Sequence, residues 1–282
     1  MQNNTENNSK SAVVKRTGQK EGFKQTVGEI WAYREMIASF VRRDLRGRYK
    51  GSVLGFLWTF VNPLLQLLVY TVVFSTILKS GIDDYYLHLF VALIPWIFFS
   101  SSVLGGAVSI LAQKDMVKKI YFPREVLPIF TVTTNFINML LCFIVVLAVV
   151  LFSGRIPHPL GLLCLIPVFA VEYLLSLGMA FFVSAVTVYL RDMEHILGIL
   201  MMAWQYLTPV LYNLDAISDP MVRFIFNLNP MTPIIEAYRD ILYWCRIPNM
   251  TNLIWAFALG VIALVVGWIT FSKLKRRFAE EL

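Results

Sequence analysis

Six long segments without a lysine, arginine or aspartate limit the folds that this sequence can adopt. A helix that crosses a bilayer needs about 20 predominantly apolar residues, and only Glu172 brings a charge into one of these segments. The segments are Gly51–Leu78, Tyr85–Gln113, Val126–Gly154, Ile156–Leu190, Ile196–Leu214 and Met250–Ser272. Charged residues make up 15% of the chain, against about 25% in a typical soluble domain. We therefore expect an all-α integral membrane protein with six transmembrane helices in residues 51–272.

The basic residues indicate how these spans are oriented. If both ends of a six-span bundle lie on one side, that side carries 20 of the 25 lysines and arginines. The positive-inside rule then places both termini, including the tail at 273–282, in the cytoplasm. Orientation thereby explains the net charge of +7, and no nucleic-acid partner is expected. Residues 1–25 are polar and lack the apolar core of a signal peptide, so we expect a disordered tail there.

Residues 216–249, between the last two predicted spans, are apolar only in short pieces. Prolines at positions 220, 230, 233 and 248 interrupt these pieces. Short, proline-broken helices at membrane depth are typical of re-entrant segments, which enter and leave the bilayer on one side. We expect a re-entrant helical pair on the outer side, before the last span.

Residues 26–50 precede the first span and are expected to form one amphipathic helix at the membrane interface. Thr26 and Glu29 fit a capping box, and apolar residues recur at helical spacing from Val27 to Leu45. The helix ends in five cations that can approach lipid phosphates. These are Arg42, Arg43, Arg46, Arg48 and Lys50. Two roles stay open for them: a membrane anchor, or a site that recruits the anionic headgroup of a lipid-linked substrate.

The loop at 113–125, between the second and third spans, is expected to lie in the cytoplasm. Asp115 can cap a two-turn helix that Pro123 ends, with Tyr121 and Phe122 among its apolar side chains. An exposed apolar helix on such a loop suggests a docking element for a soluble partner, and a tight turn packed on its own helices is the alternative. The candidate coupling residues are Lys114, Asp115, Met116, Lys118, Lys119, Tyr121, Phe122, Pro123 and Arg124.

Polar side chains recur along one face of two predicted spans. The first span carries Thr59, Asn62, Gln66 and Tyr70, and the fifth carries Gln205, Thr208 and Tyr212. A polar stripe within hydrocarbon faces the protein interior or a conduit. We expect these channel-lining candidates to form a path for a hydrophilic polymer. The alternative is hydrogen bonding between helices, at about 0.6–2 kcal/mol per bond.

Glu172 is the one acidic residue within a predicted span. An intramembrane carboxylate is a functional candidate by default, but a proton relay needs a chain of partners that the fourth span does not provide. We expect Glu172 to be protonated, or to make a structural hydrogen bond with Asn135 or Asn138.

Histidines and cysteines give no sign of a metal or catalytic site. The three histidines are assigned to span ends or loops, where an interfacial role is expected. The three cysteines lie far apart, which fits buried thiols better than a disulfide framework or a zinc site. These residues are His88, His158, His195, Cys142, Cys164 and Cys245.

Three parts of the sequence together resemble a known family. They are Arg43–Trp58 followed by Asn62–Leu64, then Lys119–Arg124 with Leu127 and Pro128, and finally Tyr189–His195. In these residues the chain is similar to the ABC-2 type permeases that export lipid-linked cell-surface polymers. That family includes O-antigen, capsule and wall teichoic acid permeases. The likeness extends over about residues 30–278.

The resemblance implies the membrane permease of an ATP-driven exporter in the bacterial cytoplasmic membrane. Its cargo would be polysaccharide or teichoic acid linked to undecaprenyl diphosphate. A second copy of the chain and two cytoplasmic ATPase subunits would complete the transporter, with ATP and Mg²⁺ bound by the ATPase. The chain itself lacks a G-x-x-x-x-G-K-[ST] motif for nucleotide phosphate, so we expect it to be neither an enzyme nor the holder of a cofactor.

Other functions stay open on the residues alone. A membrane enzyme that modifies a polyprenyl-linked substrate would use the cations of residues 42–50 for phosphate, but it lacks paired carboxylates or a metal motif at that level. A different ABC-2 cargo, such as a lipid or a drug, fits the same topology. A secondary transporter ranks below these, because no inverted repeat is visible and Glu172 is the only candidate for ion coupling.

Overall fold

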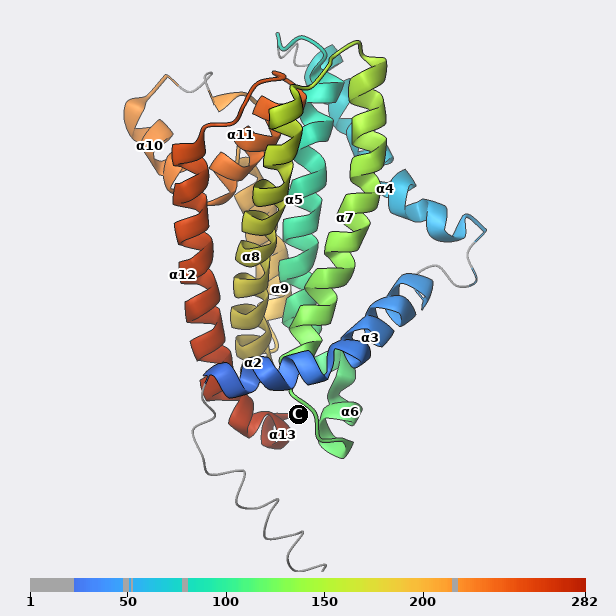
Figure 1. Cartoon of the computed structure of the whole chain (residues 1–282), viewed down its shortest axis with the longest axis vertical. Coiled ribbons are helices and arrows are strands. Elements are labelled where there is room, and N and C mark those ends of the chain that lie inside the picture. Colours follow the sequence, from blue (N-terminus) through green and yellow to red (C-terminus); the bar gives the residue numbers. More distant parts are fainter. Residues whose placement is uncertain (1–22, 48–50, 52, 78–80, 215–217) are drawn as a thin grey trace, which may run out of the picture.

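The computed structural model is an elongated bundle of helices (Figure 1). It describes residues 23–47, 51, 53–77, 81–214 and 218–282 and contains no strand within those ranges. The predicted tail at 1–25 lies almost entirely outside them. Five helices are long and apolar enough to cross a membrane: Gly55–Ser75, Tyr85–Val108, Val126–Phe152, Pro159–Tyr189 and Met250–Arg277. The all-α architecture with several membrane-crossing helices is confirmed.

The long helices follow the predicted spans closely. A short 3-10 turn, η1 (Gly55–Leu57), leads into α4 (Trp58–Thr71), which continues as a π-helical turn, η2 (Val72–Ile77). Next come α5 (Tyr85–Val108), η3 (Leu111–Gln113) and α6 (Lys114–Lys119). The third, fourth and sixth predicted spans are α7 (Val126–Phe152), α8 (Pro159–Tyr189) and α12 (Met250–Leu274).

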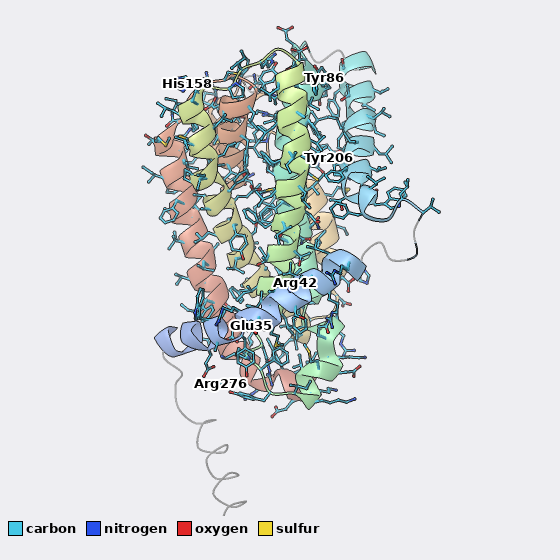
Figure 2. The ribbon with its side chains drawn as sticks, turned by 45° about the vertical axis from the view of Figure 1, so that its right-hand side comes forward. Glu35, Arg42, Tyr86, His158, Tyr206 and Arg276 are labelled. Atoms are coloured by element: carbon cyan, nitrogen blue, oxygen red, sulfur yellow. The ribbon has the colours of Figure 1, made fainter. Side chains whose placement is uncertain are left out.

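The predicted fifth span, residues 196–214, is the exception. Its helix, α9 (Met193–Tyr206), has 14 residues and is therefore about 21 Å long, shorter than a hydrocarbon core of about 30 Å. Residues 207–212 form turns and bends. Pro209 explains the early end, because proline disfavours a helical conformation at the residue before it. Figure 2 shows Tyr206 between the levels of Tyr86 and Arg42, which lie toward opposite ends of the bundle.

Polar caps followed by proline set the starts of two helices. His158 Nδ1 accepts a hydrogen bond from the Leu160 amide at 3.3 Å, ahead of Pro159 in α8. Asp219 accepts one from the Met221 amide at 2.7 Å, ahead of Pro220 in α10 (Pro220–Leu228). Proline suits the first helical position because its missing N–H would have no partner there. The predicted helical pair at 216–249 is thus α10 and α11 (Met231–Leu242).

The main core surrounds α5, which packs against α4, α7, α8, α9 and α11. Almost all of α11 is buried as well. The closest helix contact joins α8 and α12: a Cβ at Gly178 would lie 2.4 Å from the Leu264 backbone nitrogen, and one at Gly267 would lie 2.1 Å from the Gly178 carbonyl oxygen. Only glycine permits this approach of two backbones. α4 is attached far more loosely, since Thr59 and Pro63 are its only buried residues.

Two helices replace the single interface helix expected over 26–50. They are α2 (Phe23–Ala32) and α3 (Arg34–Gly47), joined by a turn at Tyr33. The helix begins before Thr26, so the predicted capping box does not mark its start. Figure 1 shows α2 lying across the lower end of the bundle and α3 rising beside α7. The bend lets α2 follow the end of the bundle while α3 packs on its side.

A second apolar cluster closes this end, called here the α6 end. It buries Val41 of α3, Val117 of α6, Phe122, Phe271 of α12 and Phe278. Phe278 opens α13 (Phe278–Glu281), which follows α12 through η5 (Lys275–Arg277). Figure 2 places Arg42 and Arg276 at the α6 end, and Tyr86 and His158 at the opposite end, called here the α10 end. The N-terminal helices and the last helix therefore share one end of the bundle.

Candidate coupling and translocation sites

The loop between α5 and α7 carries the predicted docking residues at the α6 end. α6 has six residues and stops at Lys119, because Ile120 is extended with φ −125° and ψ 135°. Gln113 precedes the helix, and no side chain caps it. The prediction that Asp115 caps a two-turn helix ending at Pro123 is wrong. Asp115 instead lies in the first turn, where a negative charge favours the helix dipole.

Exposure separates the two aromatic residues of this loop. Tyr121 is 80% exposed and its neighbour Ile120 is 59% exposed, whereas Phe122 is 5% exposed within the second apolar cluster. Phe122 therefore anchors the loop to the bundle, and the expectation that both aromatic side chains belong to an exposed docking element is wrong for Phe122. Lys114, Asp115, Lys118 and Lys119 are exposed, and Met116, Pro123 and Arg124 are partly buried. The loop thus presents Ile120 and Tyr121 within a largely basic surface.

Two charged residues fix the loop to the end of α12. Arg124 donates a hydrogen bond to the Lys275 carbonyl, and its guanidinium lies 5.8 Å from the centre of the Phe278 ring. The Lys275 ammonium lies 2.7 Å from the fully buried carboxylate of Glu125. Burial holds the pKa of Arg124 below its usual range, and the neighbouring Glu125 carboxylate opposes this shift in part.

The exposed face of α3 carries the predicted recruitment site for a substrate headgroup. Its other face packs on α7, where the Phe40 and Phe130 ring centroids are 5.2 Å apart and Val41 is buried. Arg43 lies 4.8 Å from the Phe40 ring. Of the predicted cations, Arg42, Arg43 and Arg46 are exposed, and Arg48 and Lys50 lie outside the described residues.

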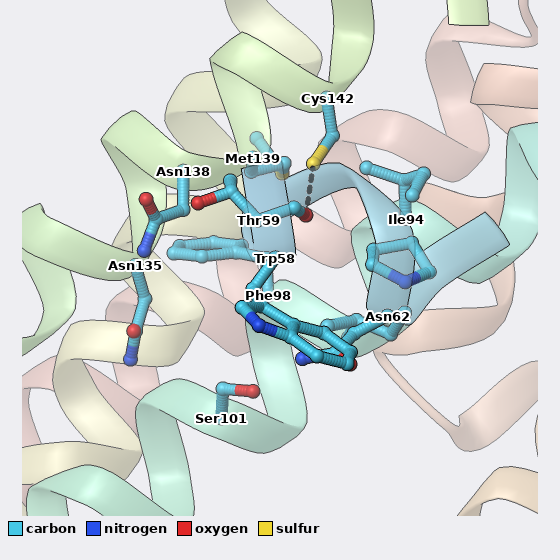
Figure 3. Close-up of a pocket in the computed structure, with 12 residues that line it drawn as sticks. Trp58, Thr59, Asn62, Ile94, Phe98, Ser101, Asn135, Asn138, Met139 and Cys142 are labelled. Carbon is cyan, nitrogen blue, oxygen red and sulfur yellow. Dashed lines mark hydrogen bonds between the residues drawn. The ribbon is translucent and has the colours of Figure 1, made fainter. Parts of the chain in front are cut away.

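The polar stripe of α4 lies in two environments. Thr59 is buried, Asn62 and Gln66 are exposed, and Tyr70 is partly buried. Thr59 and Asn62 line a cavity of about 170 Å³ between α4, α5 and α7. Figure 3 shows polar side chains from all three helices around this space, with a hydrogen bond of 3.4 Å from the Cys142 thiol to the Thr59 carbonyl.

The polar residues predicted to share one face of the fifth span do not do so, because only Gln205 lies in α9 and Thr208 and Tyr212 lie in the turns and bends that follow it. Their contacts lie away from α4. Thr208 is buried and accepts a hydrogen bond of 2.8 Å from the Asn229 amide. The Tyr212 hydroxyl donates to the Tyr206 carbonyl at 2.6 Å, and Gln205 is partly buried. None of the three lines the cavity beside α4. The expectation that the two sets of polar residues form one path for a hydrophilic polymer stays a prediction.

Buried polar residues on α11 were missed by the sequence reasoning. The Tyr238 hydroxyl donates to Glu172 Oε2 at 2.6 Å, so the expectation of Asn135 or Asn138 as the partner of Glu172 is wrong. The fully buried Arg239 donates to the Val210 carbonyl at 2.8 Å and the Tyr212 carbonyl at 3.2 Å, and it pairs with Glu236 at 3.0 Å. The available signal was a group of charged residues, Glu236, Arg239 and Asp240, within a short segment predicted to enter the membrane.

The histidines and cysteines fall into two groups. His88 is fully buried, with its ring 5.1 Å from that of Tyr243, so the interfacial role expected for it is wrong. His158 and His195 are exposed. Cys142 is buried, whereas Cys164 and Cys245 are only partly buried.

Comparison with known proteins identifies relatives over most of the chain. Residues 36–243 match the family model for ABC-2 type transporters. An O-antigen export system permease protein RfbA from Myxococcus xanthus is 36% identical, covering 91% of this chain and 98% of the relative. An RfbA from Klebsiella pneumoniae is 32% identical over 88% and 95% of the two chains. The polysialic acid transport protein KpsM of Escherichia coli is 22% identical over 80% and 88%.

The family is shown by two independent matches. The family model spans well over half of the chain, and relatives above 30% identity cover nearly all of it. The matched range includes most of α3 with its exposed arginines, and the loop around α6 that presents Tyr121. The chain belongs to the ABC-2 type transporter family.

Proposed function

We propose that this chain is the permease subunit of an exporter that moves cell-surface polysaccharide, linked to undecaprenyl diphosphate, across the bacterial cytoplasmic membrane. The observation that carries the proposal is the 36% identity to an O-antigen export permease over 91% of the chain. The relatives described above are named for O-antigen and polysialic acid. They favour polysaccharide over the wall teichoic acid that the sequence resemblance also allowed.

In this proposal the energy comes from a separate ATPase. Two permease chains assemble with two cytoplasmic ATPase subunits, which hold ATP and Mg²⁺. The exposed Ile120 and Tyr121, at the tip of a loop fixed by buried Phe122, form the docking surface. An exposed aromatic side chain beside an apolar one is the kind of anchor that dominates binding energy at protein interfaces.

The proposed topology has six crossings and two cytoplasmic termini. α9 and the turns at 207–212 together make the fifth crossing, and α10 and α11 form the outer re-entrant pair. The arrangement is supported by the shared position of α2, α6 and α13 at one end of the bundle (Figure 1). It places 20 of the 25 lysines and arginines on the cytoplasmic side.

The substrate route is proposed to begin at α3 and continue between two permease copies. Arg42, Arg43 and Arg46 attract the diphosphate headgroup, at about 1 kcal/mol for each cation near the surface. Single cysteines at Asn62 and Gln66 should then react with a membrane-impermeant thiol reagent during turnover, once the three native cysteines are replaced. Cysteines at Leu65 and Leu68 should not. Equal protection at all four positions in every nucleotide state would refute this route.

Deletion of the gene in its host tests the proposed function directly. Surface polysaccharide should disappear while lipid-linked polymer accumulates inside the cell, and the intact gene should restore export. Unchanged surface polysaccharide would refute the proposal. Loss of a chemical modification on a polymer that still reaches the surface would instead favour the membrane enzyme.

A further inference from the structure

We propose that the cavity between α4, α5 and α7, called here the α4 cavity, binds one uncharged hexose ring within a single protomer. This inference rests on the proposed polysaccharide substrate and specifies where one sugar unit is held. Its polar lining consists of Trp58, Thr59, Asn62, Ser101, Asn135 and Asn138. These residues come from three helices and line a partly open cavity of about 170 Å³.

The α4 cavity lies near the middle of the bundle. Its lining includes Ile94 and Ser101 of α5 (Tyr85–Val108), and Asn135 and Cys142 of α7 (Val126–Phe152). Both pairs fall near the midpoints of helices that are long enough to span a membrane. Polar groups at this depth have no bulk water to replace a missing partner. The lining is therefore costly unless a polar ligand or water satisfies it.

Two lining atoms are buried without a hydrogen-bond partner among the described residues, the Thr59 hydroxyl oxygen and the Asn138 side-chain oxygen. The Thr59 side chain is more than nine-tenths buried. An amide oxygen needs a donor, and a threonine hydroxyl can both donate and accept. A ligand hydroxyl does both as well, so a ring that bears several hydroxyls can satisfy Asn138 and Thr59 together.

The rest of the lining specifies the ligand further. No aspartate, glutamate, lysine or arginine lines the described walls, which disfavours a phosphate and leaves that group to the arginines of α3. The Trp58 indole supplies a flat apolar surface (Figure 3), suited to a ring with a polar rim and apolar faces. The volume greatly exceeds the roughly 10–15 Å³ that one water requires. An uncharged sugar ring matches size, charge and polarity together.

Asn62 provides access to the α4 cavity. Its side chain is exposed and also lines the cavity, so it marks the rim between interior and surface. The helix that contains α4, Gly55–Ser75, is the least buried of the five that are long enough to cross a membrane. Of its most apolar residues 11% are buried, against 78% for α5. A sugar that passes along the exposed face of α4 therefore reaches the cavity without crossing the core.

Photolabelling of the whole permease in lipid nanodiscs tests the inference. The probes are octyl glycosides of glucose, galactose and mannose that carry a diazirine in the alkyl chain. At least one should label α4, α5 or α7 residues around the α4 cavity. The unlabelled octyl glycoside should compete, and octyl pentaethylene glycol ether, which has the same chain but no sugar, should not. Labelling restricted to lipid-facing residues, or removed equally by both competitors, would overturn the proposal.

Two variants and one matched control locate the binding site. Asn138→Leu removes the buried acceptor, and Asn62→Ala changes an exposed residue that folding should tolerate. In each variant, the labelling that the unlabelled octyl glycoside can displace should fall about tenfold, which is equivalent to about 1.4 kcal/mol of binding free energy. Thr131→Val, one turn before Asn135 on α7, removes a hydroxyl that bonds its own helix at the Leu127 carbonyl and should change nothing. Unchanged labelling in folded Asn62→Ala would contradict the proposal.

Export after deletion of the gene, compared with labelling in the cavity variants, separates this inference from the proposed function. If deletion of the gene leaves surface polysaccharide intact while the α4 cavity still binds glycosides, the proposed function is wrong and the sugar site stands. If export requires the chain but labelling is the same in Asn62→Ala, Asn138→Leu and the wild type, the proposed function stands and the sugar site is wrong.

Discussion

Arg239 offers the sharpest test of how the α10 end is held together. Its fully buried guanidinium donates to the carbonyls of Val210 and Tyr212, in the turn that follows α9, and pairs with Glu236 on its own helix. These bonds attach α11 to a segment in which Pro209 has ended the helix. The substitution Arg239→Met keeps most of the side-chain volume and removes all the guanidinium N–H groups that donate these hydrogen bonds.

The cost of this substitution follows from the bonds that it breaks. Two carbonyl oxygens lose a charged donor, at about 1–3 kcal/mol each if no other donor reaches them. The total agrees with the roughly 3–5 kcal/mol lost when one partner of a buried ionic contact is removed. A domain of 150–250 residues loses about 2–4 °C of melting temperature per kcal/mol. We therefore expect Arg239→Met to unfold about 6–20 °C below the wild type.

Thermal unfolding of the purified permease, followed with a thiol-reactive dye, measures this shift. Arg191→Met is the matched control, because Arg191 is exposed in the turn between α8 and α9. Exposed charges contribute about 0–1 kcal/mol, so the control should melt within about 4 °C of the wild type. If Arg239→Met melts no lower than the control, the guanidinium does not hold the turn in place and the reasoning fails.

Three further predictions concern docking, recruitment and helix packing. Tyr121→Ala should cost about 2 kcal/mol or more of ATPase binding without loss of folding, and normal copurification of the ATPase would refute the docking surface. The double variant Arg42→Glu and Arg46→Glu should bind vesicles containing a polyprenyl diphosphate more weakly, by about 1 kcal/mol per positive charge removed, and the new negative charges should add repulsion. If the loss of binding persists in about 1 M salt, the attraction is not electrostatic and the recruitment role is refuted. Gly178→Ala should prevent the close contact of α8 with α12 and lower the yield of folded protein, because its Cβ would lie 2.4 Å from a backbone nitrogen. Gly198→Ala, with nothing within 4 Å, should fold normally, and equal yields would refute the packing argument.

The sequence could predict the long helices because hydrophobicity along a single chain determines them. α7 and α12 begin at the predicted residues, Val126 and Met250. The end of α9 was predicted wrongly because residues 207–211 remain mostly apolar. The length of this apolar segment suggested a full span, although Pro209 favours an earlier end to the helix. Hydropathy does not report where a helix stops within an apolar segment.

Residue environments were harder to predict, because they depend on contacts between distant parts of the chain. Phe122 and Tyr121 are adjacent aromatic residues, yet Phe122 is buried in the second apolar cluster and Tyr121 is exposed. Glu172 bonds to Tyr238, 66 positions away, in a segment that the reasoning treated as a re-entrant hairpin. No periodicity in one span specifies which neighbouring span supplies a partner.

The tie between the α6 loop and the end of α12 has a mechanical consequence. Glu125 holds Lys275, and α12 in turn meets α8 backbone to backbone at Gly178 and Gly267. Close packing of this kind transmits displacement with little loss, since packed interiors resist compression. A partner that docks at Tyr121, as proposed above, would therefore move α8 and α12 together as one stiff unit, and the loosely packed α4 would be the helix that yields.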